Sequence, residues 1–497
     1  MRSFKHPQMS NAKNYVACDL GAESGRVVLG RLVDDKVSLQ ECHRFPTGPT
    51  HLGGSLRWDL LKFFDEIQSG IKAAKTHVAQ IDGFSIDAWG VDYAYFSDNE
   101  PLLGTPFHYR DSRTDETYPA FLKKAGRELI FRETGVQFMQ INTLYQLYDD
   151  VLHRRPLVDL ARNFLGIADY LHYLFSGESV MERSLASTTQ IFNPVLNDWS
   201  EPLVNELGLP RELFPPVVVS GTRIGRVTPG LATELGTFPI FATCSHDTGA
   251  AVAAVPAEGE HWAFLSSGTW SLLGVELPAP RLETACMTAN YTNELGHEGT
   301  VRFLRNILGL WILQETRREM IQQGSKLEYT DLVRAAEGAP RLRSLIDPNA
   351  SEFLKPGQMI EKIQSFCRRT SQPIPEDAAS LARCILESLA LSYTTQLNQL
   401  SILLDKKIEV LHVVGGGSRN RLLNQFTANA SGLRVTAGPV EATALGNLLI
   451  QAIAAGELSS LAELRAVIRH SYAIDEFAPQ ETASWSEAKE RFSTITT

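Results

Sequence analysis

The sequence predicts an α/β protein made of two domains of similar architecture around a central cleft. Its 497 residues exceed what a single hydrophobic core usually supports, so two domains of about 250 residues are expected. Two strand–turn–strand segments lie about 250 residues apart and predict corresponding hairpins. Strands then alternate with helices in the C-terminal half, a pattern that is typical of α/β domains.

The two hairpins come first in this argument. Residues 15–32 predict an apolar strand, a polar turn from Gly21 to Gly25, and a second strand. Residues 262–277 predict the same order, with the small residues Ser266 to Thr269 in the turn. The second segment therefore reads as a structural echo of the first.

The other elements follow in chain order. Residues 81–96 predict a strand, a bend at Gly90 and a second strand, and residues 237–255 predict a strand, a polar turn and a helix. Residues 407–432 predict a buried strand, the turn Gly415–Gly417 and an amphipathic helix, and residues 433–456 repeat strand, turn and helix. The tail after Ile474 is polar and carries no motif.

Composition narrows the class of function. Apolar residues make up 43% of the chain and charged residues 21%, which is typical of a globular protein. The net charge of −10 and the lack of a basic run disfavour a nucleic-acid partner. An anionic small molecule would instead be held by backbone N–H groups and a metal ion.

The sequence predicts a cytoplasmic protein without a membrane partner. Residues 1–14 lack the apolar core of a signal peptide. The apolar stretch Leu381–Leu404 is interrupted by Glu387 and other polar residues, so it does not predict a membrane span.

The first hairpin turn is a candidate anion site. Asp19 ends the first strand, and the turn after it offers backbone N–H groups, the Ser24 hydroxyl and the Arg26 guanidinium. An ordinary hairpin turn would use the same residue types, so both interpretations stay open. The turn Ser266–Thr269 offers matching groups from the second half.

The glycines at 415–417 admit two interpretations. A dinucleotide site is disfavoured because their spacing is not GxGxxG. Glycines here would let a flat ligand such as adenine lie against the backbone, with Asn420 as a polar neighbour. The alternative is a tight strand-to-helix turn.

His246, Asp247 and Thr248 lie where a strand ends and a helix begins. Asp247 is a candidate general base for a substrate hydroxyl, although an Asp at this junction is also a common helix N-cap. A position at a helix N-terminus predicts a low pKa for Asp247.

A sugar site is suggested by two further segments. Trp89 to Asp92 and Tyr109 to Arg113 combine aromatic faces, a permissive glycine at 90, and charged donors and acceptors. A structural ion-pair network is the alternative for the Arg and Asp residues.

Nine segments in order resemble the FGGY family of carbohydrate kinases over nearly the whole chain, from Tyr15 to Ile474. They are DLGAESGR, IDAWGVDY, YRDSRT, NTLYQL, SHDTGAAV, LSSGTWSLLG, NILGLWILQ, VVGGGSRN and AGPVEATALGN. The resemblance implies two ribonuclease-H-like, actin-type domains that close over ATP and a sugar, with Mg²⁺ on the phosphates.

The resemblance also implies the site residues. The base is Asp247, and the metal ligands are Asp19 and Asp247, partly through water. The sugar-binding positions are Gly90, His246, Asp247 and Thr248. The ATP-binding positions are Ala22, Glu23, Ser24, Gly25, Arg26, Thr269, Asn306, Gln314 and Gly416. Glu23 stands where many members of the family have Ser or Thr, which puts the phosphate contacts of this residue in doubt.

The implied domains are an N-terminal extension (1–13), a sugar- and phosphate-binding domain (14–253), a nucleotide-binding domain (254–475) and a C-terminal tail (476–497). The match extends to the sugar segments of the branch that acts on L-rhamnulose. It therefore implies transfer of the γ-phosphate of ATP to the 1-hydroxyl of that ketose, in L-rhamnose catabolism. The alternatives are a kinase for another ketose, such as L-fuculose or L-xylulose, and a non-kinase actin-like ATPase.

Overall fold

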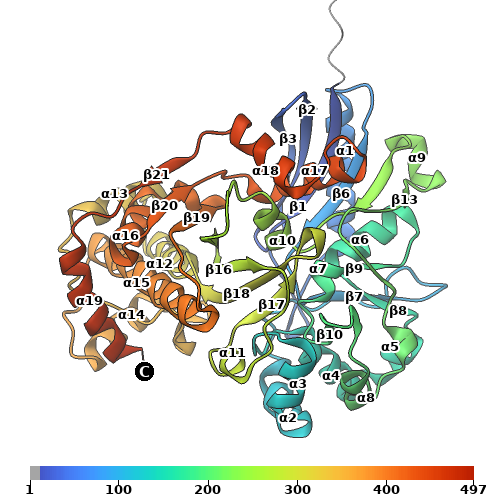
Figure 1. Cartoon of the computed structure of the whole chain (residues 1–497). Coiled ribbons are helices and arrows are strands. Elements are labelled where there is room, and N and C mark those ends of the chain that lie inside the picture. The colour runs from blue at the N-terminus through green and yellow to red at the C-terminus, as the bar shows by residue number, and fades with distance from the viewer. Residues whose placement is uncertain (1–11, 497) are drawn as a thin grey trace, which may run out of the picture. The chain divides into compact units, whose positions relative to one another are not determined.

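A computed structural model describes residues 12–496 of the chain. Most of the predicted N-terminal extension, residues 1–11, lies outside the described residues, and strand β1 (Lys13–Leu20) begins at its last residue. The described chain mixes helices with strands throughout (Figure 1), as the sequence predicts.

The chain forms two compact units, and each unit is discontinuous in sequence. The first unit combines the residues up to Ala254 with Leu277–Arg302 and Thr443–Tyr472. The second unit combines Val255–Glu276 and Phe303–Ala442 with the residues from Ala473 onward. A short C-terminal stretch of the sequence therefore completes the unit that holds the N-terminus.

The first unit is built on a six-stranded sheet in the order β13-β14-β6-β1-β2-β3. Strands β1 and β2 form the predicted hairpin, and β6 and β14 continue the sheet parallel to β1. All residues of β6 are buried, as expected for a central parallel strand covered on both faces. Beyond β1, the strands are β2 (Ser24–Val33), β3 (Lys36–Pro46), β6 (Gly83–Ala88), β13 (Thr222–Arg226) and β14 (Pro239–Ala242).

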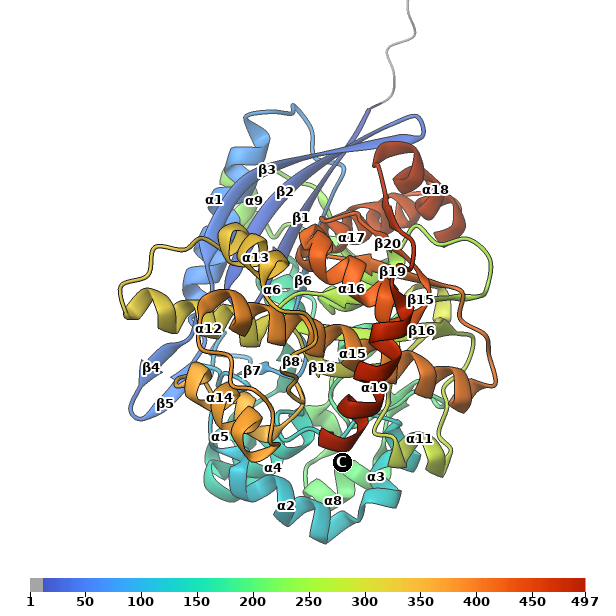
Figure 2. The ribbon, with the colours of Figure 1, turned by 90° about the vertical axis from the view of Figure 1, so that its left-hand side faces the viewer.

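Helices cover both faces of this sheet. Helix α1 (Leu60–Lys75) is capped by the Asp59 carboxylate, which accepts a hydrogen bond from the Lys62 amide, and buries an apolar stripe that includes Phe63, Ile67 and Ile71. Figure 2 shows α1 on one side of strands β1–β3 and α18 (Leu461–Ser471) on the other.

The remaining elements of the first unit are shorter. They are β4 (Thr50–Leu52), β5 (Ser55–Arg57), β7 (Tyr93–Phe96), α2 (Thr114–Ala125), α3 (Arg127–Thr134), α4 (Thr143–His153), α5 (Arg155–Leu160), β8 (Asn163–Gly166), α6 (Ile167–Ser176), β9 (Met181–Glu182), α7 (Arg183–Ala186), β10 (Phe192–Asn193), β11 (Asp198–Trp199), α8 (Glu201–Leu207), η1 (Arg211–Leu213), β12 (Val217–Val218), α9 (Pro229–Leu235), α10 (Asp247–Ala253), α11 (Thr284–Thr288) and η2 (His297–Gly299).

The second sheet has seven strands in the order β17-β18-β16-β15-β19-β20-β21. Its central order, β18-β16-β15-β19-β20, repeats the order β3-β2-β1-β6-β14 of the first sheet. The predicted echo between the two hairpins is thereby confirmed. The strands are β15 (Trp262–Ser267), β16 (Trp270–Leu277), β17 (Thr292–Leu295), β18 (Val301–Leu308), β19 (Val410–Val414), β20 (Arg434–Ala437) and β21 (Asp475–Phe477).

The long helix α15 (Ala378–Leu404) is central to the second unit. A capping box between Asp377 and Ser380 fixes its N-terminus, and it packs against α13 and α16. The helices around it are α12 (Trp311–Gln322), α13 (Tyr329–Gly338), η3 (Ser351–Phe353), α14 (Met359–Arg369), η4 (Gly416–Arg419), α16 (Arg421–Ser431) and α19 (Thr482–Ile495).

The polar C-terminal tail is folded. Strand β21 pairs with β20, and α19 buries Trp485, Ala488 and Phe492. These three residues stand at i, i+3 and i+7, so they form one apolar face on an otherwise polar helix. Single apolar residues at this spacing are sufficient to anchor the segment.

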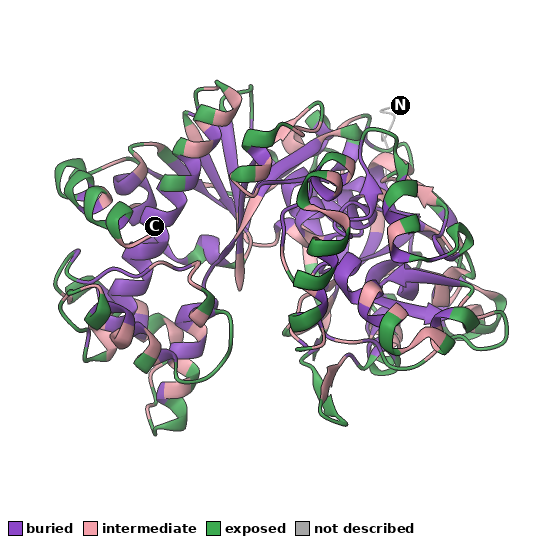
Figure 3. Cartoon of the chain, turned by 90° about the horizontal axis from the view of Figure 1, so that it is seen from below, coloured by how far each residue is buried: buried purple, intermediate pink, exposed green. Residues whose placement is uncertain are grey.

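Burial follows the sheets. Figure 3 shows the strands coloured as buried and the outward turns of the helices as exposed. Within residues 12–496, no helix combines the length and the apolarity that a membrane crossing needs.

A glycine sets the contact between α10 and α17 (Ala442–Ala454). A Cβ atom on Gly446 would lie 1.8 Å from the backbone oxygen of Ala250. Since the obstacle is backbone, neither helix can relieve the overlap by a side-chain rotation. The close approach of the two helices therefore requires glycine at 446.

We expect Gly446→Ala to lower the free energy of unfolding by about 1–3 kcal/mol, because it forces α17 away from α10. Urea denaturation of the purified variant measures this loss. Gly230→Ala in α9 is the matched control: a Cβ there meets nothing within 4 Å, so this change should be neutral or stabilising. Equal stability of the two variants would contradict the steric argument.

Candidate functional site

Three carboxylates of the first unit gather at the carboxyl ends of parallel strands. Asp19 on β1 is the direct partner of Asp87 on β6, and an isolated parallel bridge joins Ala88 to His246. Asp247 follows His246 as the first residue of α10. This edge of a parallel sheet is where α/β proteins commonly bind ligands.

The predicted anion turn is tightly held. The Gly21 amide donates to the Ser24 carbonyl at 3.1 Å, and the Thr47 hydroxyl donates to the Gly21 carbonyl at 2.5 Å. A Cβ on Gly25 would lie 2.6 Å from the ring of Phe45. The glycine at 25 is therefore needed for packing, whereas Ala22, Glu23 and Ser24 remain partly or fully exposed.

Arg26 lies opposite Asp19 in the hairpin and is paired with it. Its Nε and Nη2 atoms donate to Asp19 Oδ2 at 3.1 and 2.7 Å. The pair fixes the Asp19 carboxylate at the strand end. The sequence placed both residues in the candidate site but gave no sign that they pair with each other.

Asp87 is a buried carboxylate that sequence reasoning missed. Asn447 on α17 donates to its Oδ2 at 2.6 Å, and Gln451 in turn donates to Asn447 and to the Val16 carbonyl. The Oδ1 atom of Asp87 is buried without a hydrogen-bond partner. Burial, and then the negative charge of Asp19, raise the pKa of Asp87 well above its usual value.

Asp247 does not cap α10. The N-cap is His246, and the Oδ1 atom of Asp247 accepts from the amide and the hydroxyl of Thr248 at 2.5 and 3.1 Å. Its side chain keeps 29% exposure. The alternative of a pure N-cap is therefore wrong for this residue.

The predicted low pKa of Asp247 is also wrong. Burial raises its pKa above the usual range, and the nearby charge of Asp19 adds to the effect, while His246 and the hydrogen bonds from Thr248 oppose it. Desolvation and a like charge thus outweigh the helix terminus. The carboxylate is a stronger base than the sequence position alone indicates.

His246 lies between two carboxylates. Its Nε2 is 3.4 Å from Asp247 Oδ1, and its Nδ1 is 3.2 Å from Glu294 Oε2. Arg302, which is fully buried, forms an ion pair with Glu294 at 3.1 Å and donates to the Leu295 carbonyl.

The Glu294 carboxylate is ionised in this setting. Burial raises its pKa, but the charge of Arg302 and the hydrogen bond of His246 outweigh burial, so the pKa ends below its ordinary value. Glu294 and Arg302 were not predicted, since neither stands near His246 in sequence.

Gly90 is required for space rather than for its backbone freedom. The left-handed conformation predicted for a bend at Gly90 falls on Val91, with φ of +69°. A Cβ on Gly90 would lie 2.8 Å from the Thr188 hydroxyl oxygen. A β-branched residue in this conformation is strained, and hydrogen bonds from Thr143 and Gln146 to the Val91 carbonyl hold it there.

Asp92 organises the aromatic residues of the sugar-like segments. The indoles of Trp58 and Trp89 and the Tyr109 amide donate to its Oδ2 at 2.6, 3.1 and 3.0 Å, and Gln146 donates to its Oδ1 at 3.0 Å. Burial outweighs these donors and raises the pKa of Asp92 to about 6. The structural-network alternative therefore holds for Asp92.

The second unit carries the other predicted positions. Thr269 lies in the turn between β15 and β16, where its carbonyl accepts from the Trp311 amide at 3.2 Å. This bond ties the turn to the first turn of α12, which also carries Gln314. The Oε1 atom of Gln314 is buried without a hydrogen-bond partner. Asn306 lies on β18 and is half-buried.

The glycine loop lies beside the same turn. Strands β15 and β19 are parallel, with Ser266 opposite Val414, and a Cβ on Gly417 would lie 2.0 Å from the Ser267 hydroxyl. A Cβ on Gly416 would meet nothing within 4 Å. Asn420 caps α16 and donates to the Tyr329 hydroxyl, so its side chain is engaged inside the protein.

Within residues 12–496, no three His, Cys, Asp or Glu side chains converge to hold a metal ion by themselves. Any cation at the Asp19 and Asp247 edge would thus depend on further ligands from water or a bound molecule.

Comparisons with known proteins cover the whole chain. Residues 14–254 match the N-terminal domain of the FGGY family of carbohydrate kinases, and residues 263–455 match its C-terminal domain.

Three relatives are named rhamnulokinase. That of Bacteroides thetaiotaomicron is 41% identical over 480 residues, covering 96% of this chain and 98% of the relative. That of Enterococcus faecalis is 40% identical and covers 93% of each chain. That of Bacillus subtilis is 37% identical and covers 94% of this chain and 96% of the relative.

Solved structures share the fold at low identity. A ligand-bound xylulose kinase from Lactobacillus acidophilus has a TM-score of 0.81 at 16% identity over 97% of each chain. A gluconate kinase from the same organism has a TM-score of 0.80 at 17% identity over 98% of each chain. A glycerol kinase from Plasmodium falciparum with ADP has a TM-score of 0.78 at 13% identity over 97% of each chain. The predicted α/β fold of two ribonuclease-H-like domains is confirmed.

Proposed function

Because the chain belongs to the FGGY family of carbohydrate kinases, we propose that it transfers the γ-phosphate of ATP to the 1-hydroxyl of L-rhamnulose. The products are L-rhamnulose 1-phosphate and ADP. One observation carries the choice of sugar: rhamnulokinases match this chain at 37–41% identity over nearly its full length.

Asp247 is the proposed base. Its Oδ1 atom is held by Thr248, whereas Oδ2 accepts no hydrogen bond from a described residue and belongs to a partly exposed side chain. Oδ2 takes the proton of the 1-hydroxyl while that oxygen forms its bond to the γ-phosphorus and the bond to ADP breaks. The raised pKa of Asp247 favours this acceptance.

The sugar-binding residues of the proposal are Gly90, His246, Asp247 and Thr248. His246 is held from behind by Glu294, which leaves its Nε2 edge beside Asp247. The strained turn at Val91 supports Gly90 next to the buried Trp89 indole. These groups orient the acceptor hydroxyl, and orientation supplies much of the rate in phosphoryl transfer.

The nucleotide residues of the proposal come from both units. Residues Ala22 to Arg26 offer backbone N–H groups to phosphate oxygens. Thr269, Asn306, Gln314 and Gly416 are the positions proposed on the second unit. Open space at Gly416 supports a ligand against the backbone there, and the unpartnered Oε1 of Gln314 can accept from an amino group. In terms of sequence, we propose residues 14–253 for sugar and phosphate and 254–475 for the nucleotide.

The residues present fit Mg²⁺ as a nucleotide-borne ion. Asp19 and Asp247 are oxygen ligands at one edge, and the orphaned Oδ1 of Asp87 marks an excess of negative charge there. The ion would be held by Asp19 and Asp247, partly through water. When bound, Mg²⁺ neutralises charge on the transferring phosphate.

A panel of ketoses tests the proposed substrate. We expect L-rhamnulose to give the highest kcat/KM when ADP release is measured with L-rhamnulose, L-fuculose and L-xylulose, and mass spectrometry to detect the phosphosugar. A higher kcat/KM for another ketose would reassign the substrate. Release of inorganic phosphate without phosphosugar would instead indicate an ATPase. We also propose that the reaction takes place in the cytoplasm.

A further inference from the structure

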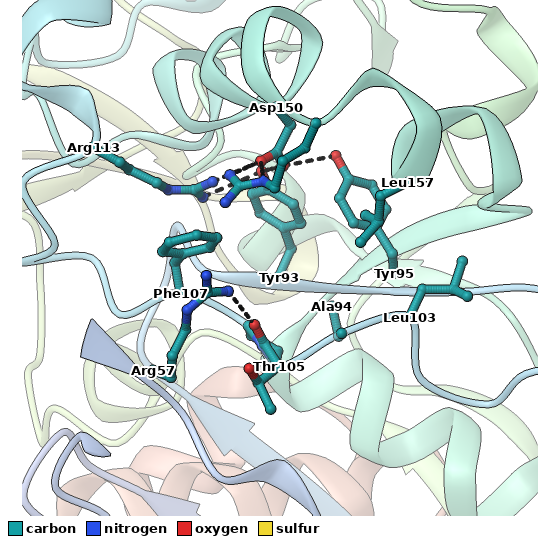
Figure 4. A pocket seen from close by; sticks show the side chains of 13 residues that line it. Arg57, Tyr93, Ala94, Tyr95, Leu103, Thr105, Phe107, Arg113, Asp150 and Leu157 are labelled. Atoms are coloured by element: carbon teal, nitrogen blue, oxygen red, sulfur yellow. Dashed lines mark hydrogen bonds and ion pairs between the residues drawn. The ribbon is translucent and has the colours of Figure 1, made fainter. Parts of the chain in front are cut away.

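A pocket in the first unit lies outside the proposed reaction site. It has a volume of about 40 Å³ and lies among Arg57, Arg113, Arg154, Tyr95, Thr105 and Phe107 (Figure 4). A space of this size holds a few water molecules or one small ion, and a nucleotide is too large for it.

Three guanidinium groups surround one phenyl ring in this pocket. The Cζ atom of Arg57 lies 3.2 Å from the centroid of Phe107, and those of Arg113 and Arg154 lie 4.0 Å from it. Figure 4 shows Phe107 between Arg57 and Arg113. Concentrated positive charge needs compensation in a partly buried place.

The nearest carboxylate is already saturated. Asp150 accepts at Oδ2 from the hydroxyls of Tyr93 and Tyr95, and at Oδ1 from Arg113 at 2.7 Å and from Arg154 Nε at 2.9 Å. Four residues thus share the two oxygens, and no lone pair of Asp150 is left for Arg57.

The other two carboxylates are engaged elsewhere. Asp149 pairs with Arg154 at 3.0 Å and with His153 at 2.8 Å. Asp111 accepts from the backbone amides of Leu56 and Arg113. Asp111 acts on Arg57 through its charge, but its oxygens are directed to these amides.

Arg57 therefore has no carboxylate in contact. Its Nε donates to the Ser55 hydroxyl at 2.9 Å and its Nη1 to the Thr105 carbonyl at 2.6 Å, and no described residue accepts a hydrogen bond from Nη2. Burial, with the charges of Arg154 and Arg113, lowers the pKa of Arg57 to about 10. The protonated guanidinium is thus less stable here than in water, and a bound anion would reverse that effect.

We propose that this pocket binds a small oxyanion, such as inorganic phosphate, on the free Nη2 edge of Arg57. The Thr105 hydroxyl, which bonds to no described residue, is the second donor at the same wall. A guanidinium is well suited to an oxyanion because its planar N–H groups match two oxygens at once.

Isothermal titration of inorganic phosphate into the full-length protein tests the site. We expect saturable binding to the parent protein and affinity that is about 10- to 100-fold weaker in Arg57→Gln, the range for losing a charged hydrogen-bond donor. Arg155→Gln is the matched control, since Arg155 lies on α5 and forms an exposed pair with Asp159. Equal affinity in the parent and Arg57→Gln proteins would overturn the proposal.

The proposed nucleotide site can also attract phosphate, so the titration is repeated with a saturating non-hydrolysable ATP analogue. Binding that depends on Arg57 should persist there, and its loss would overturn a separate site. Glycerol 3-phosphate in place of phosphate distinguishes the source of the anion: tighter binding than phosphate assigns the pocket to phosphate monoesters, and weaker binding assigns it to free phosphate.

A second variant covers the case in which Arg57→Gln fails to fold. Arg57→Lys keeps the charge but loses the planar fork, so phosphate should bind several-fold more weakly than in the parent protein. Undiminished phosphate binding in Arg57→Lys would contradict the role given to the guanidinium.

Discussion

Replacing Asp247 with asparagine should lower kcat by about 10²–10⁴ while the protein still folds and binds nucleotide. The Asn carbonyl can accept the two hydrogen bonds that Thr248 donates to Asp247 Oδ1, so the start of α10 is preserved. The amide cannot take a proton from the sugar hydroxyl, which is the step assigned to Oδ2. Steady-state kinetics with L-rhamnulose, together with nucleotide titration, measure the two effects separately.

Asp98→Asn is the matched control for this experiment. Asp98 is 74% exposed and pairs with Arg162 at the surface, so its loss should leave kcat unchanged. Near-normal turnover in a folded Asp247→Asn enzyme would remove Asp247 from the mechanism.

Glu294→Gln should lower the free energy of unfolding by about 3–5 kcal/mol, because it leaves the guanidinium of Arg302 buried without a counter-charge. The side chains of this pair are only 6% and 1% exposed, so solvent cannot replace the lost carboxylate. Since Glu294 also contacts His246 Nδ1, we expect the KM for the sugar to rise more than the KM for ATP. Urea denaturation and steady-state kinetics check the two expectations.

The control for this change is Glu283→Gln in the same chain segment. Glu283 pairs with Arg281 where the side chains are 53% and 36% exposed, and such pairs contribute about 0–1 kcal/mol. The double variant Glu294→Gln/Arg302→Met should be less destabilised than the sum of its single changes. Additive losses would show that the ion pair is not the source of the effect.

Much of the fold could be predicted because its signals are local. The hairpin at residues 15–32 alternates apolar and polar residues around a glycine turn, and the segment from Val410 to Ser431 passes from strand to glycines to amphipathic helix. The C-terminal helix α19 was missed because most of its length is polar. Only three residues of its buried face reveal its packing.

The candidate site was predicted only in part, since some of its groups meet through tertiary structure. Asp19 and Asp247 stand at strand ends, where sequence patterns draw attention. Glu294 and Asn447 lie on segments far along the chain from the residues that they contact. No spacing rule connects such positions.

Two errors share a cause. The sequence assigned the bend to Gly90 and a low pKa to Asp247 from residue type and position in a helix. In the structure, packing against Thr188 decides the role of Gly90, and desolvation decides the pKa of Asp247. Both effects depend on what surrounds a residue, which a single sequence does not display.

The hydrogen bond from Asn447 to Asp87 also sets an order of events during synthesis. The two residues are 360 positions apart, so at about 5–20 residues per second the ribosome adds Asn447 roughly 20–70 s after Asp87. A nascent chain that ends before Thr443 lacks the helix that supplies this bond and the one to the Val16 carbonyl. The carboxylate edge is therefore completed only near the end of translation, and a chain truncated before α17 cannot assemble it.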